Sequence, residues 1–190
     1  MLTDADIVVG RAQRGDRDAF RDLVELHARG LHRLAFRITG SDTDADDMVQ
    51  ETFLRAWKQL GKFDGRATFG TWLHRICSNC SLDLLRSRKR SREQAVVTVT
   101  ETGSEDGMDR IASEGPSPER LAVSGQVGEM LSRAIDGLSD AERVAFVLRH
   151  YEGVGIGEIA RTMGVQPGAA KHSVFRAVAK LRLALEGVAR

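Results

Sequence analysis

The chain has 190 residues, enough for one medium domain or two small ones. Hydrophobic residues make up 42% of it and charged residues 29%, and the formal net charge of +1 excludes a histone-like, globally basic DNA binder. No apolar run approaches the roughly 18 residues of a membrane span, and the acidic N-terminus lacks the apolar core of a signal peptide. We therefore expect a cytoplasmic protein whose two cysteines stay reduced.

Apolar residues recur every three or four positions through most of the chain, which predicts an all-α fold. Three helix starts carry capping-box or related spacing, in which an acidic residue follows three positions later: Thr3, Ser41 and Ser139. Ser117 precedes Pro118 as an N-cap precedes a proline at the first helical position.

The middle of the chain predicts a boundary between two small helical domains, 1–92 and 118–190. Gly, Ser, two of the three prolines and a cluster of acidic residues gather between them, so we expect 93–117 to be a flexible acidic linker. The stretch AVVTVT at 95–100 has strand propensity but no partner strand, and we include it in the linker.

The segment 41–60, SDTDADDMVQETFLRAWKQL, predicts a helix with a buried stripe formed by Ala45, Val49, Phe53, Ala56 and Leu60. Its opposite side would present a leucine among polar residues. Such an exposed leucine suggests a contact surface, although single exposed leucines are common in proteins. The residues on that side are Asp47, Gln50, Glu51, Leu54 and Lys58.

The segment 71–90, TWLHRICSNCSLDLLRSRKR, allows two interpretations. His74, Cys77 and Cys80 have the spacing of metal ligands or of a thiol switch, because positions three apart are neighbours on a helix. Both cysteines, however, fall on an apolar stripe, and a structural zinc site typically needs four ligands, for which no second pair exists here. We therefore favour a nucleic-acid-facing helix with cysteine in its core and a basic run at Arg86, Arg88, Lys89 and Arg90.

The segment 156–185 predicts a helix, a tight turn and a second helix. Gly164 suits the left-handed position at a helix C-terminus, Val165 would plug the turn into the core, and Pro167 would start the second helix. The second helix should bury a stripe of mostly small residues that allows close crossing, formed by Ala170, Val174, Ala177, Val178 and Leu181.

The other side of this second helix is polar and basic, with Lys171, His172, Ser173, Arg176 and Lys180. A basic helix face is often simply solvated. Combined with the short glycine turn and the small-residue crossing, however, it favours a helix-turn-helix, whose second helix enters the major groove of DNA.

Two parts of the sequence resemble bacterial sigma factors. DADDMVQETFLRAW, then FDGRATFGTWLHRI, then Asn79, Asp83, Leu85 and Arg86, resemble region 2, and LSDAERVAFVLRHYEGVGIGEIARTMGVQPGAAKHSVFRAVAKLR resembles region 4. The two regions occur in the expected order with only a short acidic linker between them, as in the extracytoplasmic-function (ECF) group. The resemblance covers nearly the whole chain outside 93–117.

The resemblance implies a dissociable initiation subunit of RNA polymerase that directs the core enzyme to particular promoters. Its polymerase-binding residues would be Asp47, Gln50, Glu51 and Leu54. Residues that engage and melt the −10 promoter element would be Phe63, Arg66, Phe69, Trp72, Arg75, Asn79, Arg86, Arg88, Lys89 and Arg90. The −35 element would be read by Lys171, His172, Ser173, Arg176 and Lys180.

The aromatic residues suit melting because apolar surface can replace lost base stacking. Phe69 and Trp72, however, fall near the apolar stripe, which favours ordinary core packing for both. A cognate anti-sigma factor is expected by analogy with the family. The recognition helix departs from the family's Thr-Val-Lys-Ser-Arg pattern, since this chain has AAKHS at 169–173. Two positions that are commonly basic in the family are Ser173 and Val178 here. The resemblance therefore implies that this helix reads a −35 element with a different set of side chains from the usual family pattern.

Other classes of protein explain less of the sequence. A free-standing helix-turn-helix regulator would leave 41–60 without a role, and an adaptor that binds no DNA would leave the basic run and the recognition helix without one. We find no convergent acid, base and nucleophile and no phosphate-binding loop, and so expect neither catalysis nor a cofactor.

Overall fold

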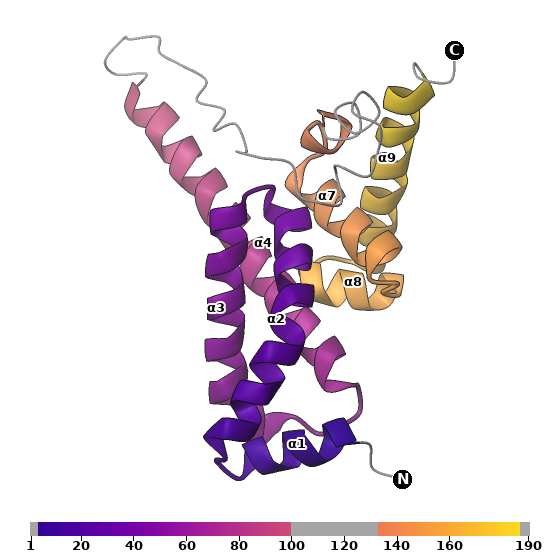
Figure 1. Ribbon diagram of the computed structural model, residues 1–190. Coiled ribbons are helices and arrows are strands. Elements are labelled where there is room, and N and C mark those ends of the chain that lie inside the picture. Colours follow the sequence, from indigo (N-terminus) through magenta and orange to yellow (C-terminus); the bar gives the residue numbers. More distant parts are fainter. Residues whose placement is uncertain (1–3, 100–132, 187–190) are drawn as a thin grey trace. The chain divides into compact units, whose positions relative to one another are not determined.

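The computed structural model describes residues 4–99 and 133–186, whose regular elements are all helical, as predicted (Figure 1). The described residues divide into two compact units, and the boundary lies inside a long helix, between Ser81 and Leu82. Among the described helices, none combines the length and apolar character needed to cross a membrane.

The N-terminal part of the chain comprises α1 (Asp4–Gln13), α2 (Arg17–Thr39), α3 (Asp42–Gln59), the 3-10 turn η1 (Leu60–Lys62) and α4 (Phe69–Val99). Local capping chemistry sets the boundary between α2 and α3. Gly40 ends α2 in the left-handed conformation with φ 75°, and Ser41 then caps α3 by accepting a hydrogen bond from the Asp44 backbone N–H. The predicted start at Ser41 is confirmed, whereas Thr3 lies outside the described residues.

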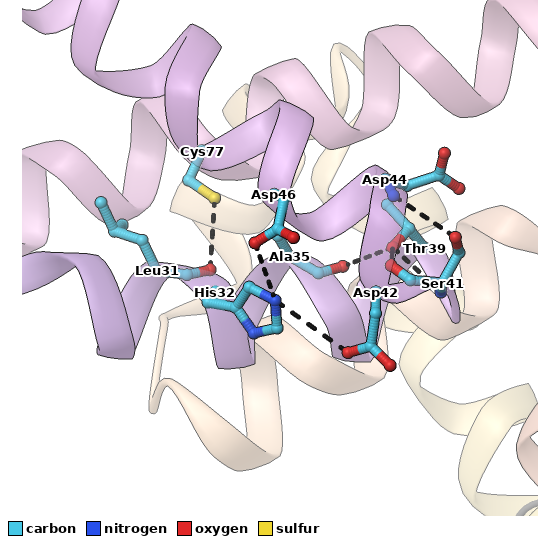
Figure 2. Close-up of polar contacts among 9 residues, drawn as sticks. All are labelled: Leu31, His32, Ala35, Thr39, Ser41, Asp42, Asp44, Asp46 and Cys77. Atoms are coloured by element: carbon cyan, nitrogen blue, oxygen red, sulfur yellow. Dashed lines mark hydrogen bonds and ion pairs between the residues drawn. The ribbon is translucent and has the colours of Figure 1, made fainter. Parts of the chain in front are cut away.

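Helices α2 and α3 pack side by side (Figure 1), and the first half of α4 packs on α2. Figure 2 shows two of the contacts: the Cys77 thiol donates to the Leu31 carbonyl at 3.8 Å, and His32 Nε2 lies 3.3 Å from Asp46 Oδ1. Cys77 is fully buried and Cys80 is 2% exposed, so the interpretation of both cysteines as core residues is confirmed. The core of this unit is apolar and includes Leu23, Leu31, Leu34, Ile38, Phe53, Ala56 and Leu73.

Helix α4 runs to Val99. Its backbone is therefore helical through 93–99, which the sequence predicts to be linker. The residues at 95–99 are thus helical despite their strand propensity. The remainder of the predicted linker and the expected helix start at Ser117 lie outside the described residues.

The C-terminal unit contains α7 (Asp140–Phe146), its π-helical continuation η2 (Val147–Tyr151), α8 (Ile156–Met163) and α9 (Pro167–Glu186). The capping box at the start of α7 is complete, because Ser139 Oγ accepts from the Glu142 N–H and the Glu142 carboxylate accepts from the Ser139 N–H. Helix α9 packs on both α7 and α8 (Figure 1).

The turn between α8 and α9 forms as predicted in its backbone. Gly164 is left-handed with φ 64°, and its backbone N–H donates hydrogen bonds to the Ala160 and Arg161 carbonyls. Helix α9 begins at Pro167. Two side-chain predictions here are wrong. Val165 is 40% exposed and does not plug the core, and Val178 is 36% exposed because it lies at the edge of a narrow stripe centred on Ala170, Ala177 and Leu181.

Candidate polymerase and promoter interfaces

One side of α3 presents acidic, amide and apolar groups at helical spacing. Asp47 and Gln50 are exposed, and Leu54 is 56% exposed, as the sequence predicted. Glu51 is half-exposed and forms an ion pair with Arg55 one turn away, at 2.6 Å. These residues stand one turn apart along the helix, so together they form a continuous strip, which we name the α3 strip (Asp47, Gln50, Glu51 and Leu54).

An aromatic pair borders the α3 strip. Trp57 is 40% exposed, and its ring lies 4.8 Å from that of Phe20 on α2. Trp57 lies roughly a quarter turn from the centre of the buried stripe of α3, which agrees with its partial exposure. The apolar part of this surface is therefore larger than Leu54 alone.

The loop before α4 is fixed at both ends. The Gln13 amide on α1 donates to the carbonyls of Leu60, at 3.1 Å, and Phe63, at 2.9 Å. At the other end, Thr68 Oγ1 accepts from the Thr71 backbone N–H and so caps the first turn of α4. Sequence reasoning missed Gln13, since no local pattern signals a bond across 47 positions.

Phe63, Phe69 and Trp72 form one aromatic cluster, with ring centroids 5.3–5.5 Å apart. Phe69 is 6% exposed and forms the floor of the cluster, whereas Phe63 and Trp72 are half-buried and reach the surface. His27 packs against Phe69 from α2, with ring centroids 5.7 Å apart. Burial, and then the neighbouring His74, lower the pKa of His27, so its ring is neutral at physiological pH.

Predicted phosphate-binding residues lie along the loop and α4. Arg66 is 90% exposed at the loop tip, where its guanidinium pairs with Asp64 at 3.2 Å. Arg86 lies 3.9 Å from Asp83 one turn earlier, and Asn79 is half-buried. The other predicted cations on this helix are exposed: Arg75, Arg88, Lys89 and Arg90.

Helix α9 turns Lys171 and His172 to solvent, while Ser173 is half-buried on the flank of the packed face. The outward side also carries an aromatic side chain, Phe175, which is 69% exposed. Sequence reasoning missed Phe175 because we looked for polar residues on this side, although its position opposite Ala177 and Leu181 was available from helical periodicity.

Arg176 and Lys180 both meet the same buried carboxylate. Arg176 Nε lies 3.1 Å from Glu142 Oε1, and Lys180 Nζ lies 2.6 Å from Glu142 Oε2. Both cations remain partly exposed, at 62% and 44%, whereas Glu142 is 3% exposed. Burial alone would raise the pKa of Glu142, but hydrogen bonds from Lys180 and Ser139 outweigh it and hold the pKa below the usual range.

Comparison with known proteins agrees with this division of the chain. The family model for sigma-70 region 2 matches residues 23–91, and the model for sigma-70 region 4 matches residues 128–181. RNA polymerase sigma-H factor of Pseudomonas aeruginosa is 32% identical over 96% of this chain and 94% of that protein. ECF RNA polymerase sigma-E factor of Escherichia coli is 32% identical over 93% of this chain and 91% of that protein.

The chain belongs to the ECF sigma factors. It is an alternative sigma factor that directs RNA polymerase to promoters, and sigma factors are non-catalytic subunits. ECF RNA polymerase sigma factor SigE of Mycolicibacterium smegmatis is 36% identical over 85% of this chain, which spans only 59% of the length of that protein.

Solved structures share the fold. The sigma factor RpoE of Bartonella quintana, in complex with the anti-sigma factor NepR, superposes with a TM-score of 0.59 at 23% identity, covering 88% of this chain and 96% of that one. CnrH, solved in complex with the cytosolic domain of CnrY, gives a TM-score of 0.58 at 28% identity and covers 97% and 99%. Membership of the ECF sigma factors, shown by the relatives above, excludes the free-standing regulator and the adaptor as descriptions of the chain.

Proposed function

We propose that this sigma factor binds the polymerase core through the α3 strip. The observation that carries the proposal is the spacing of that strip: acidic residues and an exposed leucine lie on one side of a helix whose other side is buried. Acidic side chains around an apolar anchor suit a basic, partly apolar protein surface, because complementary charge steers docking and buried apolar area stabilises it. Trp57 and Phe20 extend the apolar anchor.

The loop 63–68 and the first half of α4 engage the −10 element in this proposal. Phe63 and Trp72 offer ring surface on which an unstacked base can rest, and Phe69 supports them from below. Asn79 can donate to and accept from the edge of a base. Arg66, Arg75, Arg86, Arg88, Lys89 and Arg90 bind phosphates, a sequence-independent contribution that weakens with salt.

Helix α9 reads the −35 element from the major groove. His172 and Lys171 lie on or beside its outward side, and Phe175 adds an apolar group of the kind that contacts the methyl of thymine. Arg176 supplies a fork that suits guanine. Ser173 and Lys180 lie on a flank and would contact phosphate or the groove edge. The predicted domains 1–92 and 118–190 thus serve the −10 and −35 elements, respectively.

A cognate anti-sigma factor restrains the protein in the cytoplasm until it is needed. Support comes from the solved relatives, one of which was captured with the anti-sigma factor NepR and another with the cytosolic domain of CnrY. The exposed Leu54 and Trp57, with the half-buried Phe20, would be covered by such a partner or by polymerase, but not by both at once.

Initiation with purified components tests the proposal. The protein is mixed with RNA polymerase core, and transcripts are mapped on fragments of the genome that encodes it. We expect core-dependent initiation at a few discrete start sites, with shared sequence near −10 and −35. Tight duplex binding without core, together with no initiation in its presence, would contradict the proposal.

A further inference from the structure

A buried carboxylate joins the start of α7 to the recognition helix. Glu142 is 3% exposed, and both of its oxygens have partners. Oε2 accepts from the Ser139 backbone N–H at 2.9 Å and from Lys180 Nζ at 2.6 Å, and Oε1 pairs with Arg176 Nε at 3.1 Å. The capping box requires only the first of these contacts. The other two connect α7 with α9, 34 and 38 positions along the chain.

In the ion pair with Arg176, the guanidinium nitrogen nearest to the carboxylate is Nε. A guanidinium presents five N–H groups in a planar fork, one on Nε and four on the two terminal nitrogens. Because the ion pair joins the buried Glu142 to Nε, it restrains where the guanidinium lies, and the terminal nitrogens extend from a side chain that is 62% exposed. Two such N–H groups match the O6 and N7 acceptors of guanine in the major groove.

We propose that Glu142 is a positioning residue for promoter reading: it holds Arg176 in the orientation that pairs with a guanine of the −35 element. The inference rests on the proposed function of α9. Glu142 itself touches no base. Its effect is to replace a freely rotating cation, which binds any phosphate, with an oriented fork that selects a base.

The proposal can be tested because Glu142 should also lower the sequence-independent affinity of α9 for DNA. A buried anion next to Arg176 and Lys180 reduces the positive charge that the helix offers to phosphates, and phosphate contacts dominate sequence-independent binding. Removing the negative charge should therefore strengthen non-specific binding while weakening discrimination. Simple damage to the fold would lower both.

Glu142→Gln is the matched variant, because glutamine also serves at this position of a capping box and differs little in volume. Holoenzyme containing either protein is titrated with the promoter duplex mapped above and with the same duplex carrying a scrambled −35 element. A bidentate arginine–guanine pair discriminates by roughly 5- to 150-fold, and we expect the variant to lose about fivefold or more of the intact-to-scrambled ratio. Its affinity for the scrambled duplex should rise, with a steeper salt dependence.

A double-mutant cycle separates positioning from support of the fold. In an Arg176→Ala background, Glu142→Gln should leave the intact-to-scrambled ratio unchanged, because the side chain that it orients is gone. An unchanged ratio in the single variant, equal losses in both backgrounds, or a parallel fall of both affinities would overturn the proposal. A wild-type holoenzyme that ignored the −35 element would instead overturn the proposed function of α9, and this inference with it.

Discussion

The N-terminal unit and the recognition helix are stabilised in different ways. In the N-terminal unit, large apolar side chains such as Leu31, Leu34 and Leu73 are completely buried, and the α3 strip lies outside this core. Helix α9 packs through a smaller cluster centred on Leu138, Ala177 and Leu181, supplemented by the Glu142 ion pairs. Charges can therefore be changed on α3 without disturbing its packing, whereas on α9 the charges that we assign to DNA also contribute to packing.

The largest expected effect comes from reversing charge on the α3 strip. Asp47→Lys with Glu51→Lys should weaken binding to the polymerase core by roughly 100-fold, since like charges brought together at an interface cost several kcal/mol. The fold should remain intact by circular dichroism, because neither residue is buried. The matched control reverses two exposed acids on α2, Asp22 and Glu25, and should bind core almost normally. Equal loss in both variants would show that overall charge, and not the strip, determines affinity.

A second variant tests the small-residue core of α9. Ala177→Leu adds volume at a fully buried site and should destabilise the C-terminal unit by about 1–3 kcal/mol. Hydrogen exchange of α9 amides measures this effect. Both tryptophans, Trp57 and Trp72, lie in the N-terminal unit, so their fluorescence should show that unit unchanged.

The control for this prediction is Ala169→Leu, at an exposed position on the same helix, with an expected change within about 0.5 kcal/mol. Equal effects of the two leucines would mean that α9 does not pack through Ala177.

Much of the fold follows from local chemistry. Ser41, Ser139, Gly164 and Pro167 mark helix ends because capping depends on residues within one turn, and each was predicted from the sequence. The buried cysteines were also correctly predicted, since the stripe on α4 has a clear helical period.

The predictions that failed concern a stripe edge, a turn and a helix end. Val178 lies at the margin of its stripe, where periodicity alone does not determine exposure, and Val165 is exposed in the turn before α9. Helix α4 continues through 93–99, where we predicted a linker. Gln13 and Glu142 act on residues 34 to 50 positions away, and only the folded chain brings those groups together. Nothing in the sequence suggested a contact between Glu142 and α9, because the capping box already explained a glutamate at that position.

A smaller effect is expected at the aromatic cluster. Trp72→Ala should slow promoter opening roughly fivefold, because stacking a base on an aromatic ring contributes about 1–3 kcal/mol and Trp72 is only partly accessible. Permanganate reactivity of −10 thymines measures opening, and closed-complex binding should be unaltered. Loss of closed-complex binding by the same factor would assign Trp72 to packing and not to melting.

The smallest expected effect is a pH dependence within the N-terminal unit. Burial, followed by the nearby His74, lowers the pKa of His27 below its unfolded value of 6.5. The unfolded chain then binds a proton more readily than the folded one. This contribution to stability is therefore present above pH 6.5 and is lost as pH falls toward the lowered pKa.

His27→Gln should flatten this dependence in urea unfolding followed by tryptophan fluorescence. The exposed His172, changed to glutamine, should leave the dependence as in the wild type. The assignment would be contradicted if, at pH values below 6.5, the free energy of unfolding of the wild type decreased no more than that of His27→Gln.

The central claim is that two parts of one chain read two promoter elements. A DNA-cleaving chelate attached at Ala67→Cys in the loop, or at Ala169→Cys at the start of α9, tests it directly, because both positions are exposed and the native cysteines are buried. In a promoter complex with polymerase core, the account predicts cleavage near −10 from the first position and near −35 from the second. Cleavage of the same element from both positions, or cleavage that does not require core, would contradict it.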